Sequence, residues 1–431
     1  SSDYNIAIGF ESMENCTAPG NHNVAIGYES LDGEFMTGAG NVAIGKSCLG
    51  LAGVADGDSP DYNVAIGHQV LDATGVTGDY NVAIGTDTMG SGVVTSNYSV
   101  AIGMNSLYSL TSGLYNIGMG YRSNYATTIG NYNIAIGYDA LLTNVDGDQN
   151  IAIGYRALYE TESSDGEGQN IGIGTQAGQY ISSGVKNVFV GNNAGKGANS
   201  SEITGDGNTA IGHNAGLSLI TNATGNTLVG YLSGDAITTG DYNVAMGQNT
   251  LSAAQDVDSC VALGTGSLST ANHVYADGTT AIGRNALTSW NPSSGSAAEG
   301  SMTAVGFQAL ASAVDGASSN TAIGYYALNN STTANSNVAV GDQTLKMITT
   351  NGGNTAIGFV AGQQCVADNS GGTNNVFIGN IAGQQVKESI GSVFIGSGAG
   401  TSTATSSNWL DGDDNVAIGR NAGNGLITTA T

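Results

Sequence analysis

Residues 131–158 read NYNIAIGYDALLTNVDGDQNIAIGYRAL and contain the pattern that decides the fold of this chain. The pattern Asn-Ile-Ala-Ile-Gly occurs twice, and the second glycine follows the first by 17 residues. Ile is β-branched and favours strands, whereas Asn and Gly favour turns. A second apolar pair, such as Ala140-Leu141, follows each glycine. The stretch therefore predicts two short strands per repeat, separated by turns.

Variants of this pattern extend over the 431 residues, and we call the glycine that ends each one a column glycine. There are 23 column glycines; nine of their 22 spacings are 17 residues, six are 18, and the others are 19 to 23. A fixed minimum with variable additions predicts a coil of constant size with one variable loop. Such short units bury their apolar faces only by stacking. We predict an all-β repeat solenoid, a parallel β-roll or β-helix of about 23 coils, as a single continuous array over residues 1–431.

An asparagine stands four residues before the column glycine in 18 of the 23 repeats. Examples are Asn23 with Gly27, Asn133 with Gly137, and Asn354 with Gly358. Stacking would place these side chains in one column, where a ladder of amide hydrogen bonds or a turn-shaping role is expected. Ligand binding by the column is the alternative. Tyrosines recur beside the same asparagine and glycine, and we interpret them as stacked supports of the coil corners rather than as a sugar-binding platform.

The residue two before the column glycine is Ala or Gly in 19 repeats. The four exceptions each have Gly four residues after the column glycine, in the pairs Phe189 with Gly195, Leu228 with Gly234, Phe377 with Gly383, and Phe394 with Gly400. The two positions therefore share one packed volume, which we place inside the coil. The Val and Ile residues on either side point the opposite way and are also apolar. A strand that is apolar on both faces is buried on both, and identical chains around a common axis would cover the outer face.

Composition excludes several classes of partner. Nine basic residues oppose 34 acidic ones, for a net charge of −25, which disfavours binding to nucleic acid or anionic lipid. No run of about 18 apolar residues is present, so we expect no membrane insertion of this segment. The four cysteines, Cys16, Cys48, Cys260 and Cys365, lack the spacing of a zinc site. Because no atypical capping repeats are apparent at the ends, we expect the chain to be an excerpt of a longer fibre protein.

The sequence contains no recognisable set of catalytic residues. We therefore predict a protein that is not an enzyme, with no catalytic or cofactor-binding residues. Acidic groups in the loops include Asp56/Asp58/Asp61, Asp146/Asp148, Asp165/Glu167 and Asp411/Asp413/Asp414. These carboxylates fit either calcium binding or ordinary Asp-Gly turns, and the metal assignment stays open. A polysaccharide depolymerase is a further alternative; it would need a groove with two carboxylates roughly 5–10 Å apart.

The motif N-[VT]-A-I-G-x-x-[AS], as in residues 23–30 and 133–140, resembles the head repeats of trimeric autotransporter adhesins. It is also similar to repeat arrays of phage and large-virus tail fibres. The resemblance covers nearly the whole chain, but only at the strand positions. It implies a left-handed parallel β-roll with three chains around one axis. The repeat is longer here, and the Leu or Gly four after the column glycine departs from the family pattern.

These observations predict an extracellular fibre protein on a cell or virion surface, for adhesion or host-receptor attachment. Stacked repeats of a homotrimer would form the shaft, and the loops would recognise a cell-surface glycan or protein receptor. Trp290 and Trp409 lie in long loops and are either contact residues or fillers of local hydrophobic gaps. A purely structural, self-assembling filament is the main alternative. An ice-binding solenoid is disfavoured because the threonines form no fixed column.

Overall fold

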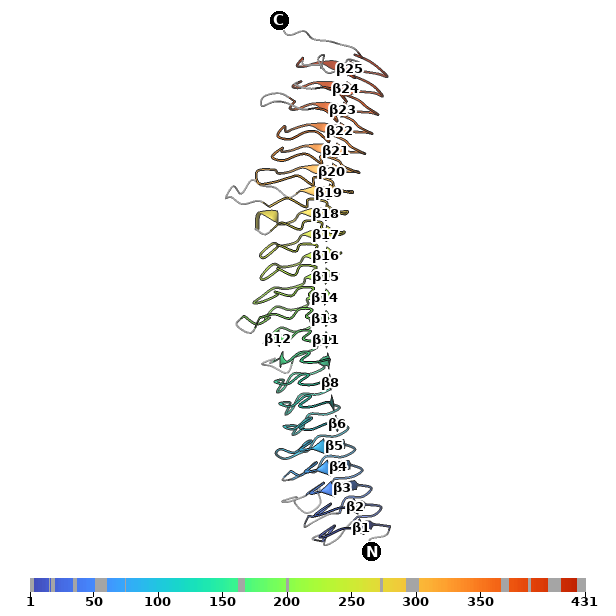
Figure 1. The fold of residues 1–431 in the computed structure, drawn as a ribbon, viewed down its shortest axis with the longest axis vertical. Coiled ribbons are helices and arrows are strands. Elements are labelled where there is room, and N and C mark those ends of the chain that lie inside the picture. The colour runs from blue at the N-terminus through green and yellow to red at the C-terminus, as the bar shows by residue number, and fades with distance from the viewer. Residues whose placement is uncertain are drawn as a thin grey trace. The chain divides into compact units, whose positions relative to one another are not determined.

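The computed structural model describes residues 4–14, 16, 20–33, 37–50, 60–73, 75–161, 167–198, 201–271, 274–291, 302–365, 372–386, 389–401 and 412–424. The chain divides into two compact units. Unit 1 comprises residues 1–214 and 220–222, and unit 2 comprises residues 215–219 and 223–431. Both units consist of stacked coils, and no α-helix occurs among the described residues (Figure 1).

Unit 1 has one strand at each repeat motif, and each strand pairs in parallel with the strand of the next coil. The register follows the repeat, so that Ala135 in one strand faces Ala152 in the next. The strands are β1 Ile6–Ile8, β2 Val24–Ile26, β3 Val42–Lys46, β4 Val64–His68, β5 Val82–Thr86, β6 Val100–Ile102, β7 Ile117–Met119, β8 Ile134–Ile136, β9 Ile151–Ile153, β11 Ile171–Ile173, β13 Val188–Val190 and β14 Thr209–Ile211. A separate parallel pair joins β10 Glu160–Thr161 to β12 Tyr180–Ile181.

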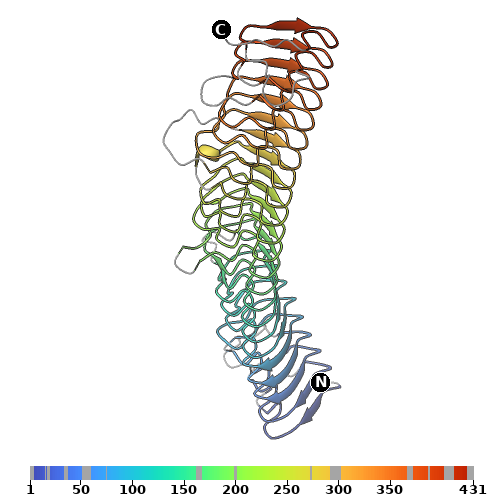
Figure 2. The same cartoon turned by 45° about the horizontal axis from the view of Figure 1, so that its top comes forward.

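Unit 2 repeats the same parallel pairing and register; Phe377, for example, faces Phe394. Its strands are β15 Thr227–Val229, β16 Val244–Met246, β17 Val261–Leu263, β18 Thr280–Ile282, β19 Thr303–Val305, β20 Thr321–Ile323, β21 Val338–Val340, β22 Thr355–Ile357, β23 Val376–Ile378, β24 Val393–Ile395 and β25 Val416–Ile418. A short 3₁₀ turn, η1, spans Val274–Ala276. In Figure 2 the strand arrows of consecutive coils lie side by side. The predicted all-β parallel solenoid is confirmed; its continuity over residues 1–431 stays a prediction.

The second apolar pair of each repeat is not a strand, and that prediction was wrong for most coils. Asp139 and Leu141 have φ values of 54° and 53°, and the same two positions have positive φ in most repeats. Asp139 donates its backbone N–H to Tyr121 O of the preceding coil at 3.0 Å, whereas Leu141 donates to Ala157 O of the next at 3.0 Å. This alternation turns the chain within a few residues, which extended backbone cannot do, and still bonds the coil to both neighbours.

The column glycines have both a backbone and a steric reason to be glycine. Gly137 has φ +138°, and a Cβ there would overlap the carbonyl oxygen of Gly154 in the next coil. Gly27 and Gly358 repeat this relation, with φ values of +138° and +137° and with overlaps at Gly45 and Gly379. Glycine tolerates such φ values at little cost. The column therefore allows the backbones of successive coils to approach closely after each strand.

The predicted exchange of volume inside the coil is confirmed. Phe189, Phe377 and Phe394 are fully buried. A Cβ on Gly195 or Gly383 would overlap the ring of Phe189 or Phe377, respectively. The coil before also contributes, since a Cβ on Gly178 would lie 2.8 Å from Cδ2 of Phe189. A large side chain at the strand centre thus needs glycine in its own turn and in the neighbouring turn, because interiors are close-packed.

The asparagine column is a ladder between coils, as predicted. Asn133 Oδ1 accepts the backbone N–H of Asn150 at 2.9 Å, and Asn133 Nδ2 donates to Gly147 O at 2.8 Å. Asn23 and Asn354 make the equivalent bonds within their own units. All three side chains are buried. Each amide therefore satisfies backbone groups that the turn leaves without a strand partner.

A second ladder runs in the opposite direction and was missed in the sequence. It consists of Asp or Asn six residues before the column glycine. Asp61 donates its backbone N–H to Asp79 Oδ1 of the next coil at 2.8 Å, and Asn131 donates to Asp148 Oδ1 at 2.6 Å. In the asparagine ladder the acceptor lies in the preceding coil; here it lies in the following coil. Much of the acidic composition of the loops therefore serves coil stacking.

Candidate functional site

The outer face of the strands is apolar and partly exposed. The residue just before the column glycine points away from the core, and it is 37% exposed at both Ile136 and Ile173 of unit 1. In unit 2 the corresponding residues Ile323 and Ile357 are 40% and 41% exposed. The central residue of each strand is buried. A single chain therefore covers the inner strand face and leaves a row of Val, Ile and Met side chains open on the outer face.

Tyrosines form exposed stacks along the coils. Five of them, Tyr62, Tyr80, Tyr98, Tyr115 and Tyr132, stack with ring centroids 5.0–5.2 Å apart. The rings are nearly parallel, and the residues are 42–54% exposed. Because each interior ring covers the faces of its neighbours, mostly edges remain for a ligand. The geometry agrees with support of the coil corners and disfavours a flat sugar-binding platform.

A charged cluster lies next to another tyrosine stack in unit 1. Arg122 donates from Nε and Nη2 to the two oxygens of Asp139 at 2.8 and 2.7 Å, and this hydrogen bonding raises the pKa of Arg122. Arg156 approaches the same buried carboxylate to 3.8 Å from the other side. The guanidinium of Arg156 also lies 5.3 and 5.0 Å from the ring centroids of Tyr155 and Tyr159. The cluster links three successive coils by charge.

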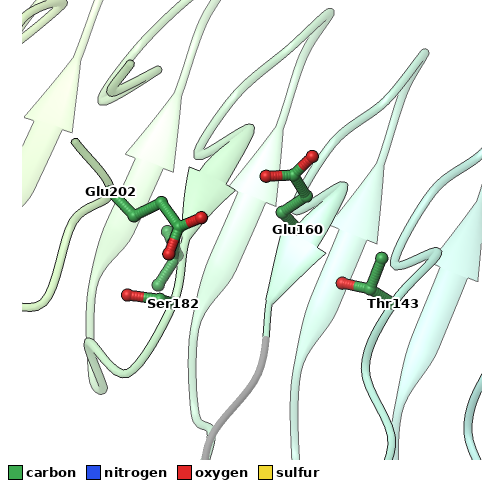
Figure 3. A pocket seen from close by; sticks show the side chains of 5 residues that line it. Thr143, Glu160, Ser182 and Glu202 are labelled. Carbon is green, nitrogen blue, oxygen red and sulfur yellow. The ribbon is translucent and has the colours of Figure 1, made fainter. Parts of the chain in front are cut away.

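The described part of unit 1 also has a cavity of about 200 Å³ lined by Thr143, Glu160, Ile181, Ser182 and Glu202. These residues come from four successive coils. Figure 3 shows Glu202 beside Ser182, Glu160 on the neighbouring coil, and Thr143 beyond it. Thr143 Oγ1 accepts the N–H of Thr161 at 3.1 Å and donates to Tyr159 O at 3.3 Å, so its hydroxyl is already engaged.

The acidic loops do not form metal sites within the described ranges, where no group of three His, Cys, Asp or Glu residues is placed to hold an ion. Asp61, Asp148 and Asp413 instead accept backbone N–H groups of the preceding coil at 2.7, 2.6 and 2.9 Å. The turn interpretation of these three residues is therefore supported. Asp56, Asp58, Asp165 and Asp411 lie outside the described residues.

Trp290 is not a surface contact. Its side chain is fully buried, and Nε1 donates to Ala317 O at 3.3 Å. The interpretation as an exposed contact residue is wrong for Trp290, and the alternative, a filler of a hydrophobic gap, describes it. Ala317 lies 27 residues further along the chain, so only the stacking of coils shows this partner. Trp409 lies outside the described residues.

The cysteines are free thiols in the structure. Cys260 occupies the asparagine column, where its backbone N–H donates to Asn243 Oδ1 at 2.9 Å and its Sγ donates to Ala276 O at 3.1 Å. Burial raises the pKa of Cys260 and of Cys365 to about 12, and that of Cys16 to about 11. A neutral buried thiol is a poor nucleophile. None of these thiols has the environment of a catalytic cysteine.

Together these features define a repetitive β-solenoid with an open apolar strand face and one polar cavity on unit 1. No family model matches the chain, and no curated protein matches it. Among the described residues there is no helix of the length and apolarity that crossing a membrane requires.

Proposed function

We propose that this chain is part of a non-enzymatic extracellular fibre that attaches a cell or virion to its target. Three copies would lie around one axis with their outer strand faces inward, as the resemblance to trimeric adhesin heads implies. The coils would provide a stiff shaft, and the loops and the cavity would face the surroundings. A cell-surface glycan or protein is the expected partner.

The observation that carries the proposal is the outer strand face. Side chains such as Ile136 and Ile173 form an apolar row that continues through successive coils of one unit. Long exposed apolar surfaces are uncommon on monomers and are typical of interfaces. A second copy of the same face is apolar in the same places, which suits association around a symmetry axis.

The mass of the purified chain in solution tests the assembly. Light scattering is expected to give three times the chain mass. The double substitution Ile136→Lys/Ile173→Lys should give a folded monomer, because both side chains point away from the core and charge in an apolar interface is costly. The matched control is Ile129→Lys, at an isoleucine that is 52% exposed and lies outside the strands; it should remain a trimer. A wild-type monomer at all concentrations would contradict the shared-axis proposal.

Attachment is tested separately, by binding of the fluorescently labelled chain to an array of immobilised glycans and to cells. Retention that disappears in the monomeric double variant supports an adhesive fibre, since multivalent binding gains from linked sites. A trimer without retention on any surface would favour the alternative, a purely structural filament.

A polysaccharide depolymerase is the second candidate, and one observation favours it. Two carboxylates, Glu160 and Glu202, line the same cavity and come from coils two apart. At roughly 4.8 Å per coil their backbones are roughly 10 Å apart, and paired carboxylates are the machinery of glycoside hydrolysis. Incubation with array glycans followed by mass analysis of released fragments distinguishes cleavage from binding.

A further inference from the structure

We propose that the unit 1 cavity binds one uncharged sugar residue of a glycan, with Glu202, Glu160 and Ser182 as its polar contacts. The inference rests on the proposed attachment function and names the site and the ligand class. It concerns the cavity described above, lined by Thr143, Glu160, Ile181, Ser182 and Glu202.

The cavity exists because two of its coils are longer than the minimum. The spacing from Gly154 to Gly174 is 20 residues and that from Gly191 to Gly212 is 21, whereas the coil between them has 17. Each long coil contributes one carboxylate, Glu160 or Glu202, and the short coil contributes Ile181 and Ser182. The extra residues include the added pairing of β10 with β12 and the bridge from Ile181 to Ile203. Insertions in loops are where recognition is commonly built.

Glu202 and Ser182 have polar groups ready for a ligand. Both residues are half-buried, and no hydrogen bond or ion pair of either side chain to the rest of the described chain is present. This contrasts with Asp61 and Asp148, whose carboxylates accept backbone N–H groups. A half-buried carboxylate without a partner gains from a hydrogen-bond donor, because hydrogen bonds to charged groups are the strong ones.

The chemistry of the lining selects the ligand. Ionised carboxylates only accept hydrogen bonds, so a ligand that presents several hydroxyl donors is complementary. Two negative charges in one cavity repel an acidic sugar. The buried Ile181 supplies an apolar wall for the C–H face of a ring, and a volume of about 200 Å³ suits a single small residue rather than a peptide. An uncharged hexose-type residue meets all of these conditions.

Saturation-transfer NMR and an array of neutral and uronate-containing glycans test the proposal on the whole chain. Neutral glycans should be retained and uronate glycans should not. Glu202→Ala and Ser182→Ala should each weaken neutral-glycan binding, the former by about tenfold or more, while hydrogen exchange of residues 143–203 stays unchanged. The matched control is Glu29→Gln in the other acidic cavity of unit 1, of about 180 Å³ and lined by Glu29, Asp32, Ser47, Gly50 and Asp72. That variant should bind like the wild type.

Three outcomes would overturn the site. These are equal binding by Glu202→Ala and wild type, preference for uronate glycans, and binding that is lost in a chelator and restored by Ca²⁺, which would make the carboxylates ion ligands. In each case attachment to cells still stands. Loss of all attachment by the wild type would instead refute the proposed function. Cleavage of a neutral glycan that requires Glu160 and Glu202 would keep the sugar site and overturn the non-enzymatic function.

Discussion

Asn150 donates its backbone N–H to Oδ1 of Asn133 at 2.9 Å, one coil earlier, and both side chains are buried. Asn133 Nδ2 donates in turn to Gly147 O of the loop that leads to Asn150, at 2.8 Å. One amide therefore ties the start of one strand to the turn that precedes the next. Such bonds repeat through each unit and hold the register of the coils.

Substitution of Asn133 by Ala should destabilise the surrounding coils by about 1–3 kcal/mol for each buried group left without a partner. Hydrogen-exchange mass spectrometry should show faster exchange over residues 117–154. The control is Thr279→Val in the same column, because Thr279 Oγ1 is buried without a hydrogen bond and removing it should cost little. Equal effects of the two substitutions would contradict the ladder as a source of stability.

Substitution of Gly137 by Ala should be more harmful than the same change at Gly207. At Gly137 the new methyl group overlaps the carbonyl of Gly154 and the φ of +138° is unfavourable, for a combined loss of about 2–6 kcal/mol. Gly207 has φ +66° and open space around it, so only a backbone cost of about 1–2 kcal/mol is expected. Thermal unfolding followed by circular dichroism measures both. Similar shifts would mean that close approach of the backbones is unimportant.

The pair Phe189 and Gly195 should behave as one unit of volume. Phe189→Ala leaves a cavity and is expected to cost about 3–5 kcal/mol, and Gly195→Leu forces a side chain into the ring of Phe189. The double variant recreates the Ala and Leu arrangement of other coils, such as Ala135 with Leu141, and should recover much of the loss. A double-mutant cycle gives the coupling. Additive losses would show that the two positions do not share a volume.

The buried thiols should resist modification. With a pKa near 12, Cys260 and Cys365 remain protonated at pH 8, so alkylation by iodoacetamide should be slow until the chain unfolds. The shift also links stability to pH. The folded-state pKa lies above the usual value of 9.0, so this contribution is intact below pH 9 and declines as pH rises toward 12. Peptide mass analysis at pH 8, with and without denaturant, measures the reactivity; rapid labelling of the folded chain would contradict burial.

Features that repeat could be predicted from the sequence. The column glycines, the asparagine ladder and the exchange of Phe189 with Gly195 each recur in phase with the coil, so their period reveals their geometry. The turn after the strand was mistaken for a strand because Leu and Ala carry no sign of positive φ, which at Leu141 results from bonding to coils on both sides.

Features that depend on contacts between particular coils could not be predicted. The partner of Trp290 is the carbonyl of Ala317, and the cavity combines Thr143 with Glu202. Neither pairing follows the repeat, since insertions of different lengths precede each residue. The aspartate ladder was periodic, but Asp-Gly and Asp-Tyr read equally well as isolated turns. Its role depends on the backbone N–H of the preceding coil.

The register of the strands has a consequence for how such a chain can change in length. Gly120, Gly137 and Gly154 are equivalent, and β7, β8 and β9 pair residue for residue. Loss of residues 121–137 would join Gly120 to Tyr138 and remove one whole coil, with every ladder closed again across the junction. Loss of eight residues would break all of them. Unequal recombination between repeats can therefore shorten or extend the array in whole coils, so that fibre length becomes a heritable trait that varies separately from the surface of any one coil.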